Sequence, residues 1–224
     1  MFGGKTIISI YGSNDFPDRS REDSERIMPM NDTSLFDHAV SFAAQAHSGV
    51  LRRGKTIPYI IHPLEASVIV SSISEDRDLL AAAVLHDVVE DTPVTLEDIR
   101  ERFGDRVASI VDVLTDRYDP AHEGLAPVES WRLRKEDSLA RIAAASRDAK
   151  IVVLGDKLAN MRAIARDAAK TGDSLWSTFK AGSREALGWY YLGLADALRE
   201  LSDLEPWKEF DRLTAFWFTK TVKA

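Results

Sequence analysis

The sequence predicts an all-α fold. Apolar residues recur at spacings of three and four along most of the chain, which is the period of an amphipathic helix. The 224 residues are enough for one self-sufficient hydrophobic core but few for two catalytic domains. Because turn residues interrupt the helical pattern at short intervals, we expect one compact helical domain over residues 33–224.

Residues 1–32 differ in character from this domain. After a short β-prone piece at 7–11, the segment is rich in Asp, Ser, Arg, Glu and Asn and has no apolar period. Such a composition is typical of an arm or a linker, because it offers too little apolar surface for a core. We therefore expect a polar N-terminal arm.

The first half of the domain is predicted to contain short helices. A cap at Thr33 or Ser34 opens the first helix, which runs to about His47, and a basic loop follows at 51–58. Proline is tolerated in the first helical turn, so the second helix is expected to open at Pro63.

A third helix is expected from Leu79 and should continue without a break to Asp91. Thr95 and Asp98 resemble a capping box at the start of a fourth helix, which should stop near Gly104. The apolar stripe after this glycine predicts a fifth helix.

The second half is predicted to contain longer helices, preceded by a proline-containing loop at 118–127. The helical pattern covers three stretches: 129–147, 149–169 and 183–201. In the second of these, the run Ile151–Leu154 is locally strand-like. It continues into a polar helical pattern and is therefore interpreted as part of a buried helix.

Composition excludes several classes of function. With no cysteine, the chain can hold no disulfide, thiolate nucleophile or iron–sulfur cluster, so His, Asp, Glu or water must bind any metal. The 29 basic and 36 acidic residues give a formal charge of −7, which argues against a nucleic-acid partner but allows a small anionic ligand. No apolar run is long enough for a membrane span or a signal peptide, so we expect a cytoplasmic protein without a membrane partner.

The candidate chemistry begins at the adjacent pair His86 and Asp87. Glu90 and Asp91 follow one turn later and, on a continuous helix, share the faces of that pair. These acids near a helix C-terminus would oppose the helix dipole, so the cluster predicts a bound cation. As an alternative, Glu90 and Asp91 are ordinary surface acids near a helix end.

Two further residues are candidates for the remaining metal ligands. His62 lies where the basic loop meets a helix start, although a lone histidine there is more often a structural one. Asp156 follows the apolar run that ends at Leu154, where an unpaired carboxylate would be costly to bury. Asn160 lies one turn further on.

The order His, His-Asp, Asp resembles the signature of the HD metal-dependent phosphohydrolases. More narrowly, residues from about 36 to 201 resemble the hydrolase domain of the Rel/Spo alarmone enzymes and the stand-alone small alarmone hydrolases. The resemblance rests on FAAQAHSG (42–49), PYIIHPL (58–64), LHDVVEDT (85–92), FGDRV (103–107) and GDKLANMR (155–162).

The resemblance implies a role for each site residue. The metal ligands would be His62, His86, Asp87 and Asp156. Their mixed nitrogen and oxygen donors, without thiolate, suit Mn²⁺, the usual ion of the family. Glu90 and Asp91 would orient or deprotonate the attacking water, which is the general-base role.

The resemblance also implies a nucleotide-binding surface. The basic loop holds Arg52, Arg53 and Lys55. Guanidinium groups stack on planar rings and bind phosphate, so this loop would hold the base and phosphates. Asn160 matches a family residue that contacts the sugar and phosphates. Lys180 and Tyr190 are further candidates, although an aromatic cluster at helical spacing is more often core.

The expected activity is Mn²⁺-dependent hydrolysis of the 3′-pyrophosphate of ppGpp or pppGpp, with a small nucleotide as substrate. Since the chain ends at Ala224, we expect a hydrolase without the synthetase domain of bifunctional relatives. Ala159 and Ala163 replace the His and Thr that the family often has, which leaves an adenine alarmone, NADPH or a nucleoside monophosphate as alternative substrates. A sensor that binds alarmone without hydrolysis is another alternative, against which Glu90 and Asp91 argue. The sequence leaves a homo-oligomer open.

Overall fold

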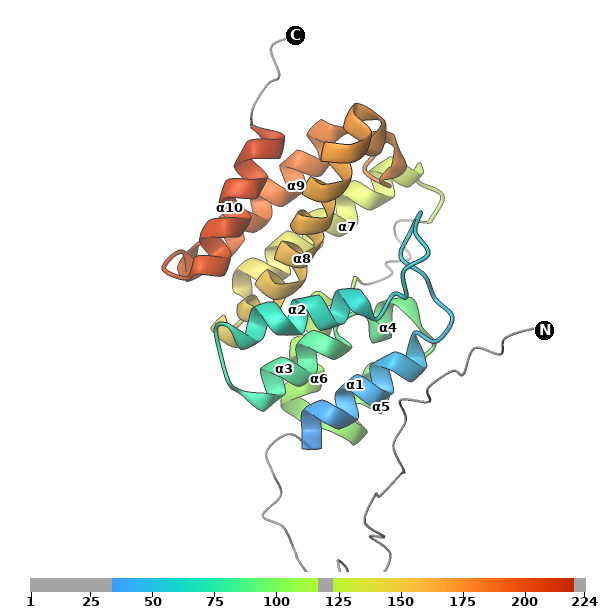
Figure 1. Ribbon diagram of the computed structural model, residues 1–224, viewed down its shortest axis with the longest axis vertical. Coiled ribbons are helices and arrows are strands. Elements are labelled where there is room, and N and C mark those ends of the chain that lie inside the picture. The colour runs from blue at the N-terminus through green and yellow to red at the C-terminus, as the bar shows by residue number, and fades with distance from the viewer. Residues whose placement is uncertain (1–33, 117–122, 220–224) are drawn as a thin grey trace, which may run out of the picture. The chain divides into compact units, whose positions relative to one another are not determined.

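The described part of the chain, residues 34–116 and 123–219, is built from helices in a computed structural model of the protein (Figure 1). Within these residues, the only pairing of extended backbone is an isolated bridge between Leu51 and Pro58. The expected all-α fold is therefore confirmed. The predicted arm over residues 1–32 lies outside the described residues, as does residue range 118–122 of the predicted loop.

The helices of the first half are short, and two of them begin with a side-chain cap, from Asp76 and from Thr95. They are α1 (Ser34–Ala46), α2 (Ile61–Ser71), α3 (Arg77–Leu85), α4 (Val88–Asp91), α5 (Leu96–Phe103) and α6 (Asp105–Leu114). The capping box predicted at Thr95 and Asp98 is present at the start of α5. Gly104 separates α5 from α6 with a φ of 89°, which favours glycine.

The second half contains the longer helices. They are α7 (Pro127–Ala144), α8 (Arg147–Thr171), the 3₁₀ helix η2 (Gly172–Thr178), α9 (Arg184–Ala197), the 3₁₀ helix η3 (Arg199–Leu201) and α10 (Glu205–Phe218). The run Ile151–Leu154 lies within α8, which confirms its interpretation as a buried helix. Among the described residues, no helix is both long and apolar enough to cross a membrane.

The α8 helix is the centre of the core and packs against α2, α3, α6 and α10 (Figure 1). Its residues from Ala149 to Asp156 are all buried. The backbones of α2 and α8 approach closely at Gly155, where an added Cβ would lie 2.9 Å from the Ala66 carbonyl oxygen and 2.7 Å from Val70 Cγ2. Only glycine fits this contact without a shift of its neighbours.

The start of α2 and the presence of α10 differ from the prediction. The α2 helix begins at Ile61 rather than at Pro63. The proline still lies in the first turn, where its missing N–H leaves no helical hydrogen bond unmade. The α10 helix was not predicted, although Trp207, Phe210 and Thr214 follow its helical period and the last two are fully buried.

The predicted continuous helix from Leu79 to Asp91 is wrong, because α3 ends at Leu85 and α4 begins at Val88. On a continuous helix, adjacent side chains point about 100° apart. At the break, Asp87 has φ −93° and ψ −7°. This turn lets His86 and Asp87 both face the buried side, towards α2 and α8.

Candidate metal centre and active site

Four side chains converge where α2, the α3–α4 break and α8 meet. His62 Nε2 lies 3.1 Å from Asp156 Oδ1 and 3.5 Å from Asp87 Oδ2. His86 Nε2 lies 3.0 Å from Asp87 Oδ2 and 3.5 Å from Asp156 Oδ1. We call these four residues the donor cluster. The structure therefore brings together the four residues that the sequence motifs single out as metal ligands.

The ring of His86 is oriented by the backbone. Its Nδ1 lies 2.8 Å from the Ala83 carbonyl oxygen, so the neutral ring carries its proton on Nδ1 and donates it there. Its Nε2 is buried and has no hydrogen-bond partner among the described residues, although two carboxylates lie within 3.5 Å. Buried lone pairs that face one another in this way need a shared cation.

The spacing of the donor atoms fits a divalent metal ion. Ligands about 2.1 Å from an ion, at angles of about 90° to 109°, lie about 3.0–3.4 Å apart. The four nitrogen–oxygen separations within the donor cluster are 3.0, 3.1, 3.5 and 3.5 Å, and one donor atom each of His62, His86 and Asp87 lies within 4.8 Å of the other two. Two imidazole nitrogens and two carboxylate oxygens also form a donor set that Mn²⁺, Fe²⁺ and Zn²⁺ accept.

The charges of the cluster shift one another's protonation. Burial lowers the pKa of His86, but Asp87 and Asp156 raise it by more, so it lies well above the usual 6.5. Burial raises the pKa of Asp87, but His86 and His62 lower it by more. Burial likewise raises the pKa of Asp156, and Lys157 and His86 together lower it well below its usual range. Both carboxylates are thus held ionised.

Three polar side chains orient the two carboxylates. The Tyr59 hydroxyl donates to Asp87 Oδ2 at 2.7 Å, and the Asn160 amide donates to Asp156 Oδ1 at 2.7 Å. Lys157 Nζ lies 2.6 Å from Asp156 Oδ2. Such partners fix the orientation of ligands at metal sites. Tyr59 and Lys157 were not predicted as site residues, although both lie inside motif segments that carry the resemblance.

Glu90 and Asp91 lie on α4, shortly after His86 and Asp87 in the chain, and both are exposed. Atoms nevertheless crowd the Glu90 carboxyl, and this desolvation, together with the charges of Asp116 and Asp87, raises the pKa of Glu90. Because α4 is a separate helix of four residues, the predicted opposition of these acids to a helix dipole is wrong. The converging donor atoms are what favours a bound cation here.

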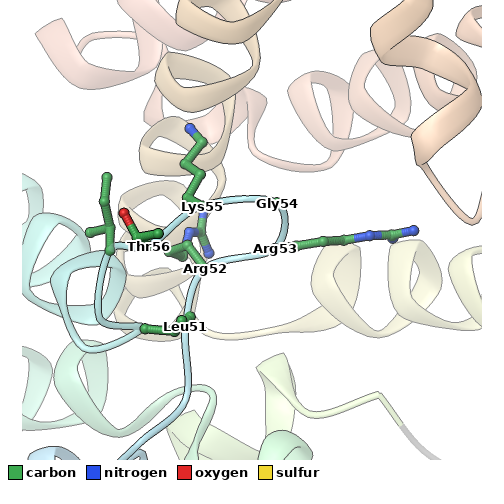
Figure 2. A pocket seen from close by; sticks show the side chains of 7 residues that line it. Leu51, Arg52, Arg53, Gly54, Lys55 and Thr56 are labelled. Carbon is green, nitrogen blue, oxygen red and sulfur yellow. The ribbon is translucent and has the colours of Figure 1, made fainter.

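The basic loop lines an open cavity of about 640 Å³ (Figure 2). Arg52 donates to Asn160 Oδ1 at 3.3 Å, and its guanidinium lies 5.5 Å from the centre of the Tyr59 ring. Since Asn160 and Tyr59 themselves contact the two carboxylates, Arg52 is held beside the donor cluster.

The other two basic residues of the loop differ in their contacts. Lys55 turns towards α8, where its Nζ lies 2.8 Å from Asp167 Oδ2 (Figure 2). Arg53 extends away from the loop in another direction, is exposed, and has no hydrogen bond or ion pair within the described residues (Figure 2). Arg53 is therefore free to meet an anionic ligand, whereas Lys55 must first give up its partner.

Tyr190 and Lys180 lie apart from the basic loop in the chain. Tyr190 is 4% exposed and packs against Trp131 with ring centres 6.1 Å apart, so its ring is part of the core. Its hydroxyl is buried without a partner among the described residues. Lys180 lies in the turn before α9 and is exposed. Within the described structure, neither side chain forms a hydrogen bond to the donor cluster.

Comparison with known families identifies the class of protein. Residues 39–186 match the HD domain. This match covers more than half of the chain, and the chain belongs to the HD-domain family.

The relatives give a narrower likeness. The chain is 38% identical over 139 residues to the guanosine-3′,5′-bis(diphosphate) 3′-pyrophosphohydrolase MESH1 of Xenopus tropicalis, covering 61% of this chain and 73% of that protein. It is 36% identical over 183 residues to a probable GTP pyrophosphokinase of Mycobacterium leprae, covering 79% of this chain and 21% of that protein. The chain spans only 17% to 21% of the length of the first four curated relatives that it matches.

A solved structure shares the fold over most of the chain. It is described as "A metazoan ortholog of SpoT hydrolyzes ppGpp and plays a role in starvation responses". The TM-score is 0.65 at 28% sequence identity, and the match covers 80% of this chain and 93% of that one. The helical HD-domain fold is thus shared with a known hydrolase structure.

Proposed function

We propose that the chain hydrolyses the 3′-pyrophosphate of guanosine 3′,5′-bis(diphosphate), ppGpp, or of its analogue pppGpp, giving GDP or GTP and pyrophosphate. The observation that carries this proposal is the convergence of two imidazole nitrogens and two carboxylate oxygens at 3.0–3.5 Å, next to the acids Glu90 and Asp91. The likeness to MESH1, whose name states this reaction, supports the choice of substrate.

Mn²⁺ is the proposed ion, and the donor cluster would hold it. When bound, a divalent ion of this kind lowers the pKa of water and polarises a phosphoryl oxygen. On the side of the protein, Tyr59, Asn160 and Lys157 orient the two carboxylates, and the Ala83 carbonyl fixes the ring of His86. These contacts support a preorganised metal site.

Glu90 and Asp91 are proposed to orient the attacking water and to accept its proton. A general base works best when its pKa approaches the working pH, and the surroundings of Glu90 raise its pKa in that direction. The water oxygen forms a bond to the phosphorus next to the 3′ oxygen. The bond from this phosphorus to the 3′ oxygen breaks and the 3′ oxygen takes up a proton, so that pyrophosphate and GDP or GTP with a free 3′ hydroxyl are released.

The nucleotide is proposed to lie along the basic loop. Arg52 would stack on the base or bind phosphate beside Asn160, and Arg53 would meet a phosphate without first losing a partner. Lys55, Lys180 and Tyr190 stay predictions for further contacts. We place the activity in the cytoplasm, where ppGpp is the alarmone of the stringent response.

The alternative substrates are not favoured. MESH1 and the relatives of Aquifex aeolicus and Haemophilus influenzae all carry guanosine-3′,5′-bis(diphosphate) in their names. An adenine alarmone, NADPH and a nucleoside monophosphate therefore serve as comparison substrates in the test.

The test measures pyrophosphate release from ppGpp by the purified chain, with and without Mn²⁺. We expect Mn²⁺-dependent release that is lost in His86→Ala and in Asp87→Ala. His38→Ala is the matched control, because the ring of His38 packs on Phe103, with centres 5.1 Å apart, outside the donor cluster. Turnover by a folded, metal-free His86→Ala/Asp87→Ala variant would contradict the proposal, and ppGpp binding without turnover in Mn²⁺ would indicate a sensor.

A further inference from the structure

An ion pair behind α4 links Glu90 to α7. Asp116 lies two residues after the end of α6, and its side chain is only 8% exposed. Its carboxylate lies 2.6 Å from Lys135 Nζ and 3.7 Å from Arg134 Nη1, both on α7. Its backbone N–H donates to Glu90 Oε2 at 3.4 Å. One residue therefore contacts both the acid on α4 and the cations on α7.

Lys135 is itself held from a second side. Its Nζ lies 5.2 Å from the centre of the Tyr190 ring, which is buried between α7 and α9. The side chain of Lys135 is 18% exposed, so its position is set by protein contacts rather than by water. The pair of Asp116 and Lys135 is thus a fixed charged unit in contact with Glu90.

We infer that Asp116 and Lys135 are positioning residues for Glu90, which hold its carboxylate in place and set the electrostatic environment in which it works. The inference rests on the proposed function, in which Glu90 acts on water. Asp116 and Lys135 both lie outside the motif segments that carry the family resemblance.

The charges that face Glu90 come from every element around it. Burial raises the pKa of Glu90 most, followed by the negative charges of Asp116 and Asp87. The positive charges of Lys135 on α7 and Lys157 on α8 lower it. Asp116 therefore raises the pKa of Glu90 and Lys135 lowers it, although the loss of either residue breaks the same ion pair.

The opposite effects of Asp116 and Lys135 can be tested through the pH dependence of activity. The pH dependence of kcat/KM for ppGpp hydrolysis is measured at fixed, saturating Mn²⁺ for the wild type, Asp116→Asn and Lys135→Met. The acid limb reports the deprotonation of the general base. Asp116→Asn removes a negative charge, so the limb should move to lower pH by roughly 0.5 to 1 unit, and Lys135→Met should move it to higher pH by a similar amount.

A purely structural role would give a different result. Because both variants break one ion pair, such a role predicts shifts of the same sign or no shift at all. Lys135→Arg keeps the cation and should restore the wild-type profile. If Lys135→Met does not fold, Lys135→Gln removes the same charge and carries the same expectation.

The matched control is Asp137→Asn, also an Asp-to-Asn change in an ion pair, but one formed within α7. Asp137 is 65% exposed, pairs with Arg141 at 2.8 Å, and is not among the charges that face Glu90. Its profile should match the wild type. A wild type without Mn²⁺-dependent hydrolysis would overturn the proposed function. An active wild type whose profile is unmoved, or moved in the same direction, by the two variants would overturn only the role of Asp116 and Lys135.

Discussion

Replacement of Gly155 by alanine should disturb the metal site from a distance. Gly155 lies on α8 next to Asp156, at the point where α8 meets α2, which carries His62. A methyl group at this position would lie 2.9 Å from the Ala66 carbonyl oxygen and 2.7 Å from Val70 Cγ2, whereas ordinary contact begins at 3.4 Å. The Val70 side chain can rotate, but the Ala66 carbonyl belongs to the backbone of α2.

The magnitude follows from this contact. The two helices must separate by about 0.5 Å to bring the carbonyl to ordinary distance. Overpacking against backbone costs about 3 kcal/mol, and the better helix propensity of alanine returns about 1 kcal/mol. The net loss of about 2 kcal/mol lowers Tm by about 4–8 °C in a domain of this size. Metal sites tolerate ligand displacements of only about 0.2 Å, so the affinity for Mn²⁺ should fall roughly tenfold or more.

The assay is thermal unfolding together with calorimetric titration of Mn²⁺, and Gly193→Ala is the matched control. Gly193 also lies within a helix, α9, and its added Cβ would lie 2.8 Å from Leu139 Cδ1. That atom is the end of a flexible side chain, so the clash is relieved by rotation, and Tm should stay within about 2 °C of the wild type. The reasoning is refuted if Gly155→Ala unfolds like the control and binds Mn²⁺ with wild-type affinity.

Three further predictions concern charge. In metal-free protein the pKa of His86 is raised above its usual 6.5, so its stabilisation is complete below about pH 6.5 and is lost as the pH rises through the folded value. Tm of the metal-free protein should therefore fall as the pH rises above 6.5. This fall should be absent from the His86→Ala variant and from Mn²⁺-loaded protein. The same dependence of Tm on pH in all three would contradict the prediction. Arg53→Ala should raise the KM for ppGpp roughly tenfold, about 1.4 kcal/mol, with Tm unchanged, because Arg53 has no partner among the described residues. A lowered Tm would point to a structural role instead. Arg162→Ala removes two 2.7 Å hydrogen bonds to Glu209 that connect α8 to α10. Because both side chains are partly exposed, the free energy of unfolding, measured by denaturant titration, should fall by only about 1 kcal/mol. A loss above 3 kcal/mol would show that the pair is worth more than its exposure suggests.

Local sequence patterns predicted most of the helices because capping and apolar period act over a few residues. The capping box at Thr95 and the buried run Ile151–Leu154 are examples. The break between α3 and α4 could not be predicted in this way, since the helical period continues through it. The break is explained by tertiary structure, because it turns both His86 and Asp87 towards α2 and α8.

The candidate site was predictable as a set of residues but not as a geometry. The motif order singled out His62 and Asp156, which lie on different helices and meet at 3.1 Å only through the packing of α2 on α8. The pairing of Lys55 with Asp167, 112 residues away, has no local signal. The resemblance gave roles to the ligands and acids, whereas Tyr59 and Lys157 became visible only through their contacts.

Tyr59 connects the two halves of the site through one side chain. Its hydroxyl bonds to Asp87, a proposed ligand of the ion, and its ring lies beside Arg52, a proposed contact of the nucleotide. We therefore expect occupancy of one half to change the surroundings of the other, and any such coupling of binding free energies is reciprocal. If Mn²⁺ tightens the binding of nucleotide by some factor, the nucleotide tightens the binding of Mn²⁺ by the same factor. At scarce metal, a rise in the proposed nucleotide substrate would itself load the protein with the proposed ion.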